Sequence, residues 1–239
     1  MSAARNASLA VPRSDLEGFF VGIRAATEEM ALRTRDRERT EANRFNVFNL
    51  IDPDENKLSS ILADLLDPRG SHGQGDVFLR LFFGQLGLDM DAELTAGATV
   101  RREAPTYSIA RSLRRMDVLV DAGVLVAIEH KVDSPEQAEQ VKDYLEHLQA
   151  CARQRGNRSV LVYLTPDGRR PVSTAGLSAK GLPGCGLECW SHRDDLTKWL
   201  RTCRERCEAR KIQDFLSDFL AHVRTALIAR EFDARRKGT

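Results

Sequence analysis

The hydrophobic pattern of the chain has a helical period near both ends and a strand-like pattern in the middle. Before residue 90, apolar residues recur every three or four positions in three segments, which predicts helices at 16–32, 53–66 and 76–86. The same spacing predicts two closing helices, at 196–207 and 212–223. Between these helical ends, short uninterrupted runs of Val, Leu and Ile predict strands that are buried on both faces.

The two central apolar runs, 115–120 and 124–131, flank turn residues at 121–123 and predict a β-hairpin. Charged residues stand at its open end, although an isolated buried charge costs several kcal/mol unless it is paired or bound to a metal. These residues are Asp117 on the first strand and Glu129, His130 and Lys131 on the second. A metal site would explain their presence.

Side chains alternate between the two faces of a strand, so Glu129 and Lys131 share one face and His130 takes the other. A strict two-residue turn would pair Asp117 with Ile128 and put the two acids on opposite faces. A loop of three or five residues, or a bulge, would instead bring Asp117 opposite Glu129. We therefore predict the looser turn.

Two carboxylates that converge on one point form a hard oxygen site, which suits Mg²⁺ or Mn²⁺. Lys131 beside them would hold a water near the metal or stabilise charge on a phosphate. Arg111, Arg114 and Arg115 precede Asp117, and guanidinium groups match phosphate oxygens. The solubility of an edge strand explains these arginines equally well, so both interpretations stay open.

The segment after Lys131 predicts a helix that starts at 133–136 and runs to about residue 155. One stripe of this helix contains Gln137, Gln140, Val141, Tyr144 and Leu148. Polar groups on a buried stripe need partners, so we expect this stripe to face the carboxylates; ordinary amphipathic packing is the alternative. The opposite face, with Glu139, Lys142, Asp143 and Glu146, is expected to be solvated.

A further apolar run at 160–165 completes a strand–helix–strand unit, which predicts a right-handed crossover and parallel pairing. Residues 171–186 are expected to form a long loop and 187–191 a short edge strand. The fold class is therefore α/β, with a mixed sheet flanked by helices. The expected organisation is a disordered N-terminus (1–14), one domain (15–229) with a helical part (15–90), a sheet core (98–191) and C-terminal helices (192–229), and a charged tail (230–239).

Asp117, eleven intervening residues and Glu129-His130-Lys131 resemble the signature of the PD-(D/E)xK nuclease superfamily. Gln137, Gln140 and Tyr144, at six, nine and thirteen residues after Lys131, resemble one bacterial branch of that superfamily. Further resemblance lies in Leu65-Leu66-Asp67-Pro68, Ser71-His72-Gly73 and the run 162–168. The resemblance extends over roughly residues 45 to 225.

The resemblance implies a restriction-endonuclease-like fold and a Mg²⁺- or Mn²⁺-dependent nuclease that hydrolyses phosphodiester bonds. The metal would be bound by Asp117, Glu129 and the backbone carbonyl of His130, with Lys131 and Gln137 in catalytic roles. Nucleic acid, with DNA favoured over RNA, would be contacted by Arg114, Arg115, Gln140, Tyr144 and His72. The branch favours a cytoplasmic enzyme of antiphage defence.

Two positions carry alternatives. In related nucleases a glutamate from the first core helix reaches the metal, and Glu55 occupies the matching position; a capping box with Asp52 at the N-cap, Pro53 at N1 and Glu55 at N3 is the structural alternative. His72 either contacts a phosphate or bonds to its own loop. Where the family often shows histidine before the helix serine, this chain has Leu58 before Ser59.

The composition restricts the function in several ways. The net charge of +1 over 239 residues means that nucleic acid must be bound by a local basic patch. The mixed-charge run 33–39 is expected to be a solvated helix face rather than that patch. No apolar run is long enough to span a bilayer, and five cysteines without a secretion signal indicate reduced thiols. Zinc bound by Cys185, Cys189, Cys203 and Cys207 is disfavoured, because the last two lie on an apolar stripe.

Two rival functions follow from the same residues. The chain would be a nucleic-acid-binding module that keeps the fold without cleavage, although its acidic and lysine positions are all filled. Alternatively it would be a helical subunit of a larger defence complex, forming a homodimer or binding a partner protein through its C-terminal helices, 196–227.

Overall fold

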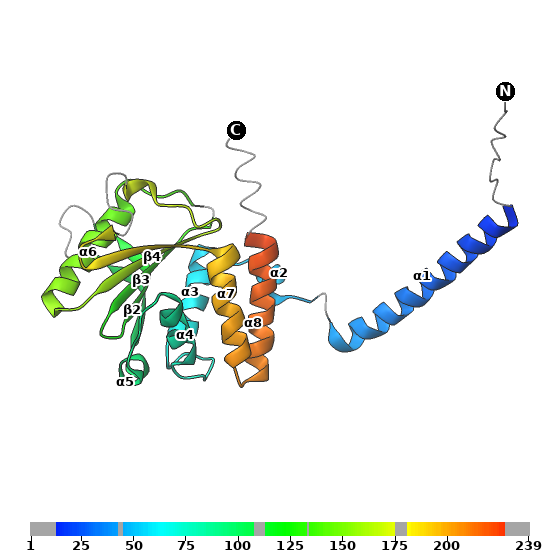
Figure 1. The fold of residues 1–239 in the computed structure, drawn as a ribbon, viewed down its shortest axis with the longest axis horizontal. Helices are drawn as coiled ribbons and strands as arrows, with labels where there is room; N and C mark the ends of the chain where they lie inside the picture. The colour runs from blue at the N-terminus through cyan, green and yellow to red at the C-terminus, as the bar shows by residue number, and fades with distance from the viewer. Residues whose placement is uncertain (1–12, 43–44, 108–112, 133, 175–180, 228–239) are drawn as a thin grey trace, which may run out of the picture. The chain divides into compact units, whose positions relative to one another are not determined.

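The computed structural model of the chain describes residues 13–42, 45–107, 113–132, 134–174 and 181–227 (Figure 1). The chain divides into two compact units, residues 1–46 and residues 47–239. The charged tail predicted at 230–239 lies outside the described residues, as does the predicted disordered N-terminus except for its last two residues, which begin a helix.

The described part of the first unit contains one long helix, α1 (Arg13–Glu41), which extends beyond the predicted 16–32. The mixed-charge run 33–39 lies on this helix, as expected for a solvated helix face. Arg33 there pairs with Glu29 one turn earlier, at 2.6 Å, which is the spacing at which helical side chains meet. The interval predicted as one domain, 15–229, thus includes a helix that belongs to a separate unit.

The second unit begins and ends with helices and has its strands between them, as the hydrophobic pattern predicts. Its elements are α2 (Val47–Ile51), α3 (Glu55–Leu66), α4 (Val77–Gln85), α5 (Ala92–Ala96), β1 (Thr99–Pro105), β2 (Arg115–Asp121), β3 (Leu125–His130), α6 (Gln140–Arg155), β4 (Ser159–Thr165), β5 (Gly181–Leu182), β6 (Cys185–Ser191), α7 (Thr197–Arg206) and α8 (Arg210–His222). Short π-helical turns, His192–Leu196 and Val223–Leu227, precede α7 and follow α8.

The strands form one mixed sheet of six in the order β1-β2-β3-β4-β6-β5. The first three are antiparallel, whereas β3, β4 and β6 run parallel, so the predicted parallel pairing of the two strands that α6 connects, β3 and β4, is confirmed. The prediction that 171–186 is entirely loop is wrong, because β5 lies in that interval and pairs with Cys185 and Gly186, the first two residues of β6. Residues 187–191, the predicted edge strand, form the rest of β6 and pair only with β4 among the described strands. Gly181 makes the pairing of β5 possible: a Cβ there would lie 2.4 Å from the Cys185 carbonyl oxygen, and its φ is +92°.

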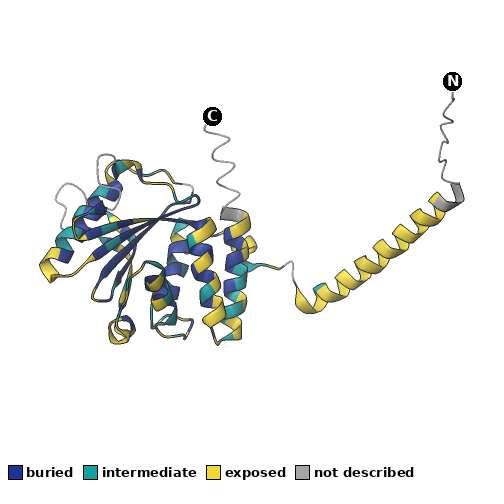
Figure 2. Cartoon of the chain, viewed as in Figure 1, coloured by how far each residue is buried: buried dark blue, intermediate teal, exposed yellow. Residues whose placement is uncertain are grey.

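Helices cover the sheet on both faces (Figure 1). On one face, α6 packs over a core that contains Leu119, Ala127 and Leu161. On the other, α3, α4, α7 and α8 cover a larger core that contains Val118, Val126 and Val162 (Figure 2). The chain therefore has the predicted α/β fold, a mixed sheet flanked by helices, consistent with a restriction-endonuclease-like architecture.

The cysteines are distributed between the two cores. Cys185 lies in the core beneath α6, whereas Cys203 and Cys207 lie in the core on the opposite face. All five thiols are free of disulfide bonds. Among the described residues, no helix is both long enough and apolar enough to serve as a membrane span.

Candidate active site at the open end of the β2–β3 hairpin

The register of the hairpin decides whether the two acids share a face. A three-residue turn centred on Gly123 joins β2 to β3, so the predicted looser turn is confirmed. Gly123 has φ of +79°, in the left-handed region that glycine enters without a Cβ penalty. The pairing runs to Val118 opposite Ile128, so the next residues, Asp117 and Glu129, stand opposite each other on the face that α6 covers.

Glu129 is the most enclosed of these groups, with its side chain 1% exposed. Its Oε1 accepts hydrogen bonds from Lys131 Nζ at 2.8 Å and from Gln140 Nε2 at 2.7 Å. Its Oε2 is buried and has no hydrogen-bond partner among the described residues. A buried carboxylate oxygen left without a partner is costly, so this atom needs a ligand or a proton.

Asp117 is held from the opposite strand and is only partly buried. Its Oδ2 accepts a hydrogen bond from the backbone N–H of His130 at 2.7 Å. Within the described part of the chain, no donor contacts its other oxygen, Oδ1. One oxygen of Asp117 and one of Glu129 thus stay available on the same face of the hairpin.

Burial and like charge both act on this pair of acids. Burial, together with the neighbouring Asp117 carboxylate, raises the pKa of Glu129 to about 8, although Lys131 opposes the rise. Burial also raises the pKa of Asp117, against the His130 N–H and the Lys131 ammonium. For Lys131, burial opposes protonation, but the carboxylates of Glu129, Glu55 and Asp117 together outweigh burial and raise the lysine pKa. The site therefore favours an added positive charge.

Glu55 lies at the same end of the sheet but has a different local role from the predicted capping box. Its Oε1 accepts hydrogen bonds from the backbone N–H groups of Val132 and Ser134, at 2.8 and 2.9 Å. Burial alone would raise the pKa of Glu55. The two N–H donors and the Lys131 charge outweigh burial, so the net effect is a lowered pKa. The Glu55 carboxylate thereby fixes the segment that follows β3.

The predicted capping box at the start of α3 is wrong. The N-cap is Asp54, whose side chain accepts from the Lys57 N–H at 2.9 Å, so Glu55 is the first helical residue rather than the third. Asp52 has φ of +36° and lies outside the helix. The adjacent acids in this segment made the cap position ambiguous by two residues.

Gln140 and Tyr144 connect the carboxylates to β2. Gln140 Nε2, besides its bond to Glu129, lies 3.1 Å from the Tyr144 hydroxyl. That hydroxyl donates to the backbone carbonyl of Arg115 at 2.6 Å. Burial, followed by the Glu129 charge, raises the pKa of Tyr144, which keeps its hydroxyl protonated as a donor. The prediction that these two residues face the carboxylates is confirmed.

Gln137 does not share their stripe, because α6 begins only at Gln140 and not at 133–136. Glu139, just before it, adopts φ of +59°, which interrupts helical geometry. Gln137 Oε1 instead accepts from Arg114 at 2.9 Å, and Gln137 lines a cavity of about 500 Å³ with Tyr163. Asp133, the predicted start of the helix, lies outside the described residues.

Arg114 is occupied by protein partners rather than directed at solvent. Its guanidinium pairs with Asp143 at 2.7 Å and also donates to the carbonyl of Ala138 at 2.6 Å. Asp143 is 1% exposed, so its predicted place on the solvated outer face of α6 is wrong. A charge pattern read along a helix does not reveal a partner 29 residues earlier in the chain.

The remaining predicted contacts are placed apart from the carboxylates. Arg115 is exposed and pairs with Glu103 at 3.1 Å. His72 is buried, and its two ring nitrogens lie 3.0 Å from the Asp67 carbonyl oxygen and from the Gln74 N–H. His72 therefore bonds to its own loop, as in the alternative stated above.

His130 points its ring to the opposite face of the sheet. Its Nε2 lies 2.7 Å from Nε2 of His192, and both rings are buried. Burial lowers the pKa of His130 to about 4 and lowers that of His192 well below its ordinary value, so both imidazoles are neutral. Sequence reasoning missed His192, because a histidine 62 residues downstream gives no local signal of this contact.

The donor set at the hairpin fits a hard divalent cation. The two carboxylate oxygens that have no partner among the described residues are ligands of the kind that Mg²⁺ and Mn²⁺ prefer. Among the described residues, no three His, Cys, Asp or Glu side chains group closely enough to bind a metal by themselves. Magnesium commonly binds through only one or two carboxylates and takes its other ligands from water and substrate phosphates.

The fold and these side chains together define a nuclease-like class: a mixed sheet with an acid on each of two paired strands and a lysine two residues after the second. A family model described as the PD-(D/E)XK nuclease superfamily matches residues 45–221, which is most of the chain. The chain belongs to this superfamily. No match was found among curated proteins or among solved structures.

Proposed function

We propose that the protein is a divalent-metal-dependent nuclease that hydrolyses phosphodiester bonds at the open end of the β2–β3 hairpin. One observation carries the proposal. The hairpin register puts Asp117 opposite Glu129 on one face, and the buried Oε2 of Glu129 has no partner within the described residues. Membership of the nuclease superfamily supports the reaction class.

The chain's own residues divide the work between holding the cation and controlling charge. Asp117 and Glu129 would hold Mg²⁺ or Mn²⁺, with the His130 carbonyl as a third oxygen. When bound, the cation supplies electrostatic stabilisation of a phosphoryl oxygen and lowers the pKa of water. Lys131, held by Glu129 at 2.8 Å, positions a water or neutralises charge that develops on the phosphate.

The outer residues keep these groups oriented. Gln140 fixes Glu129 Oε1, so the carboxylate presents its other oxygen to the cation. Glu55 anchors the backbone at Val132, immediately after Lys131, and its negative charge adds to that of the two acids. Outer partners of this kind typically contribute about 10–100-fold to metal affinity or activity.

We propose DNA as the substrate and antiphage defence as the biological setting, both from the branch resemblance of Gln137, Gln140 and Tyr144. The arginines near the site offer limited phosphate contacts. Arg114 is engaged by Asp143, whereas Arg115 is exposed. Gln137, which contacts Arg114, would act through it rather than on the metal.

Cleavage assays test the proposal directly. The purified protein is incubated with Mg²⁺ or Mn²⁺ and with plasmid, linear duplex, single-stranded DNA and RNA. We expect cleavage of DNA that stops on chelation and is lost in Glu129→Ala and Lys131→Ala. Binding that ignores chelation, without cleavage of any substrate, would make the chain a binding module. Cleavage by either variant at the parent rate would refute the assigned roles.

A further inference from the structure

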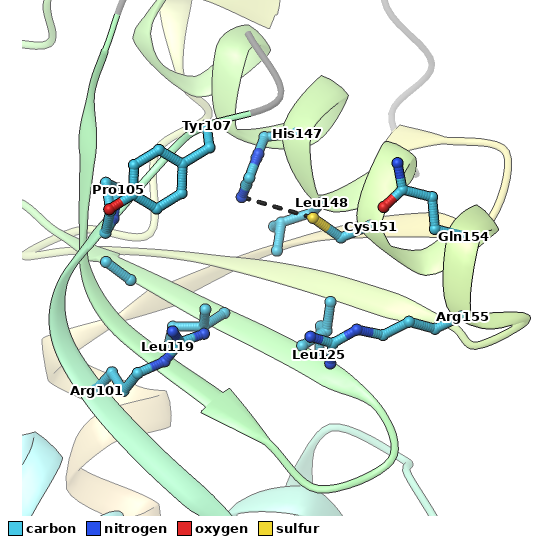
Figure 3. Close-up of a pocket in the computed structure, with 11 residues that line it drawn as sticks. Arg101, Pro105, Tyr107, Leu119, Leu125, His147, Leu148, Cys151, Gln154 and Arg155 are labelled. Atoms are coloured by element: carbon cyan, nitrogen blue, oxygen red, sulfur yellow. Dashed lines mark hydrogen bonds between the residues drawn. The ribbon is translucent and has the colours of Figure 1, made fainter.

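A second hollow lies on the same face of the sheet as the two carboxylates. It has a volume of about 320 Å³ and lies between β1 and the second half of α6 (Figure 3). Apolar side chains form part of its lining: Leu119 of β2, Leu125 of β3 and Leu148 of α6. Leu119 is two residues from Asp117 on the same face of β2, which corresponds to about 7 Å along a strand.

Positive charge borders the hollow. Arg101 and Arg155 line it, and no carboxylate is among the described residues that line it. Arg155 is anchored by Asp121 at 2.5 Å. Arg101 is exposed and makes no hydrogen bond or ion pair with any described residue. A guanidinium without a partner beside an apolar surface is suited to a phosphate group.

Flat rings stand at one end of the hollow. Tyr107 is 79% exposed, and Figure 3 shows its ring and that of His147 at the same end, away from Arg155. His147 Nε2 lies 3.7 Å from Cys151 Sγ, and burial lowers the histidine pKa, so this ring is uncharged. Neutral aromatic rings with nearby arginine are the surfaces on which unpaired bases stack.

The volume restricts the occupant. A hollow of about 320 Å³ is at the small end of ligand pockets, so it fits a single base with its sugar and not a duplex. Base-paired strands bury their bases and present phosphates outward. The combination of apolar surface, rings and a guanidinium without a partner among the described residues therefore matches a nucleotide whose base is unpaired.

We propose that this hollow binds an unpaired nucleotide of the substrate strand, next to the phosphodiester that reaches Asp117 and Glu129. The inference rests on the proposed nuclease function and adds its substrate class: a single strand, or a duplex end that has opened. Arg101 contacts the nucleotide's phosphate, and its base stacks on the exposed ring of Tyr107, at the end of the hollow that His147 also lines.

Cys151 provides a reporter that is independent of cleavage, because it lines the hollow and is only partly buried. Cys189→Ser removes the other partly buried thiol, and Cys185, Cys203 and Cys207 are buried. Lys131→Ala is added to prevent turnover, or Glu129→Gln if circular dichroism shows that the first variant is unfolded. The alkylation rate of Cys151 is then measured in Mg²⁺ with single-stranded oligonucleotide, blunt duplex or mononucleotide.

We expect the single strand to slow alkylation at least tenfold, at concentrations where blunt duplex and mononucleotide have little effect. Arg101→Glu should remove this protection and, with Lys131 intact, raise KM for single strands about tenfold while kcat changes little. Arg102→Glu is the matched control, because Arg102 points to the other face and donates to the Asn56 carbonyl oxygen at 3.1 Å.

The outcomes separate this inference from the proposed function. A parent protein that cleaves nucleic acid, with a Cys151 that no oligonucleotide protects, would overturn the inference and leave the nuclease intact. Equal protection by duplex or by mononucleotide would also overturn it. Protection of Cys151 by single strands without any cleavage by the parent would support the hollow as a nucleotide site and remove the proposed function.

Discussion

Two neighbouring residues of β3 show how differently the two faces of the sheet treat buried ionisable groups. Glu129 and His130 are each 1% exposed, yet they project to opposite faces. Burial raises the pKa of Glu129 to about 8 and lowers that of His130 to about 4. Both faces thus favour the neutral form, but only one of them gathers further charges around it.

The difference lies in the partners. His130 meets His192, and the two neutral rings satisfy each other at Nε2 and leave only uncharged Nδ1 atoms without partners in the described structure. Glu129 meets Lys131 and faces a second carboxylate, Asp117. An unpaired neutral group costs about 1–3 kcal/mol, whereas an unpaired charge costs more. The face beneath α6 is therefore arranged for a ligand, and the opposite face for packing.

The largest expected effect is the loss of cleavage on removing the lysine. Lys131→Ala takes away the ammonium beside Glu129, and loss of one such electrostatic contact lowers kcat about 10²–10³-fold. Lys142→Ala is the control, since Lys142 pairs with Glu139 near the surface of the same region. Initial rates on the best substrate measure both. Equal losses in the two variants would show that the loss is not specific to Lys131, which would contradict its assigned role.

The histidine face should matter less and only through position. His192→Phe removes the hydrogen bond between the two imidazole rings. The backbone N–H of His130 donates to Asp117, and its backbone carbonyl is a proposed metal ligand. We expect about 10–100-fold loss in activity and in metal affinity, as for other outer partners. His192→Gln, which retains a hydrogen-bonding group, should restore part of the loss. If the two variants are equally stable but bind the metal with different affinity, His192 acts by positioning His130. If stability and affinity fall together, its role is packing.

The smallest expected effect is on stability without metal. Because the pKa of Glu129 is raised from 4.5 to about 8 on folding, its contribution to stability is complete below about pH 4.5 and lost as pH rises through 8. In chelator, the parent should lose about 1–2 kcal/mol more than Glu129→Gln between pH 7 and 9. Urea unfolding at both pH values measures this difference. If the stability of the parent and of Glu129→Gln changes equally with pH, the pKa of Glu129 is not raised on folding, and its carboxylate is solvated.

Local periodicity was enough to predict the elements that build the site. The alternation along β3 predicted the shared face of Glu129 and Lys131. The need to bring the two acids onto one face predicted a loop of three or five residues or a bulge, of which the structure has the three-residue loop. The apolar stripe of α6 correctly directed Gln140 and Tyr144 toward the carboxylates. These inferences succeeded because each depends on residues close together in the chain or on the strict period of a strand.

Pairings between distant segments were beyond such reasoning. The charge pattern of α6 predicted that Asp143 is solvated, whereas in the fold it pairs with Arg114. Nothing in the sequence near His192 indicated its contact with His130. The start of α6 was missed because one residue, Glu139, takes a left-handed conformation that its side chain does not announce. The strand β5 was also missed. Its two residues pair with β6 only because the chain reverses at Gly184, and two residues are too few to show a strand pattern.

The central claim is that Asp117 and Glu129 together hold one divalent cation, and calorimetric titration of Mn²⁺ into the metal-free protein tests it most directly. We expect one ion to bind the parent protein, with binding lost in Asp117→Asn and in Glu129→Gln. Glu136→Gln is the matched control, because the Glu136 carboxylate accepts from the Val172 and Ser173 N–H groups away from the hairpin. Undiminished binding of Mn²⁺ by both hairpin variants would contradict the account.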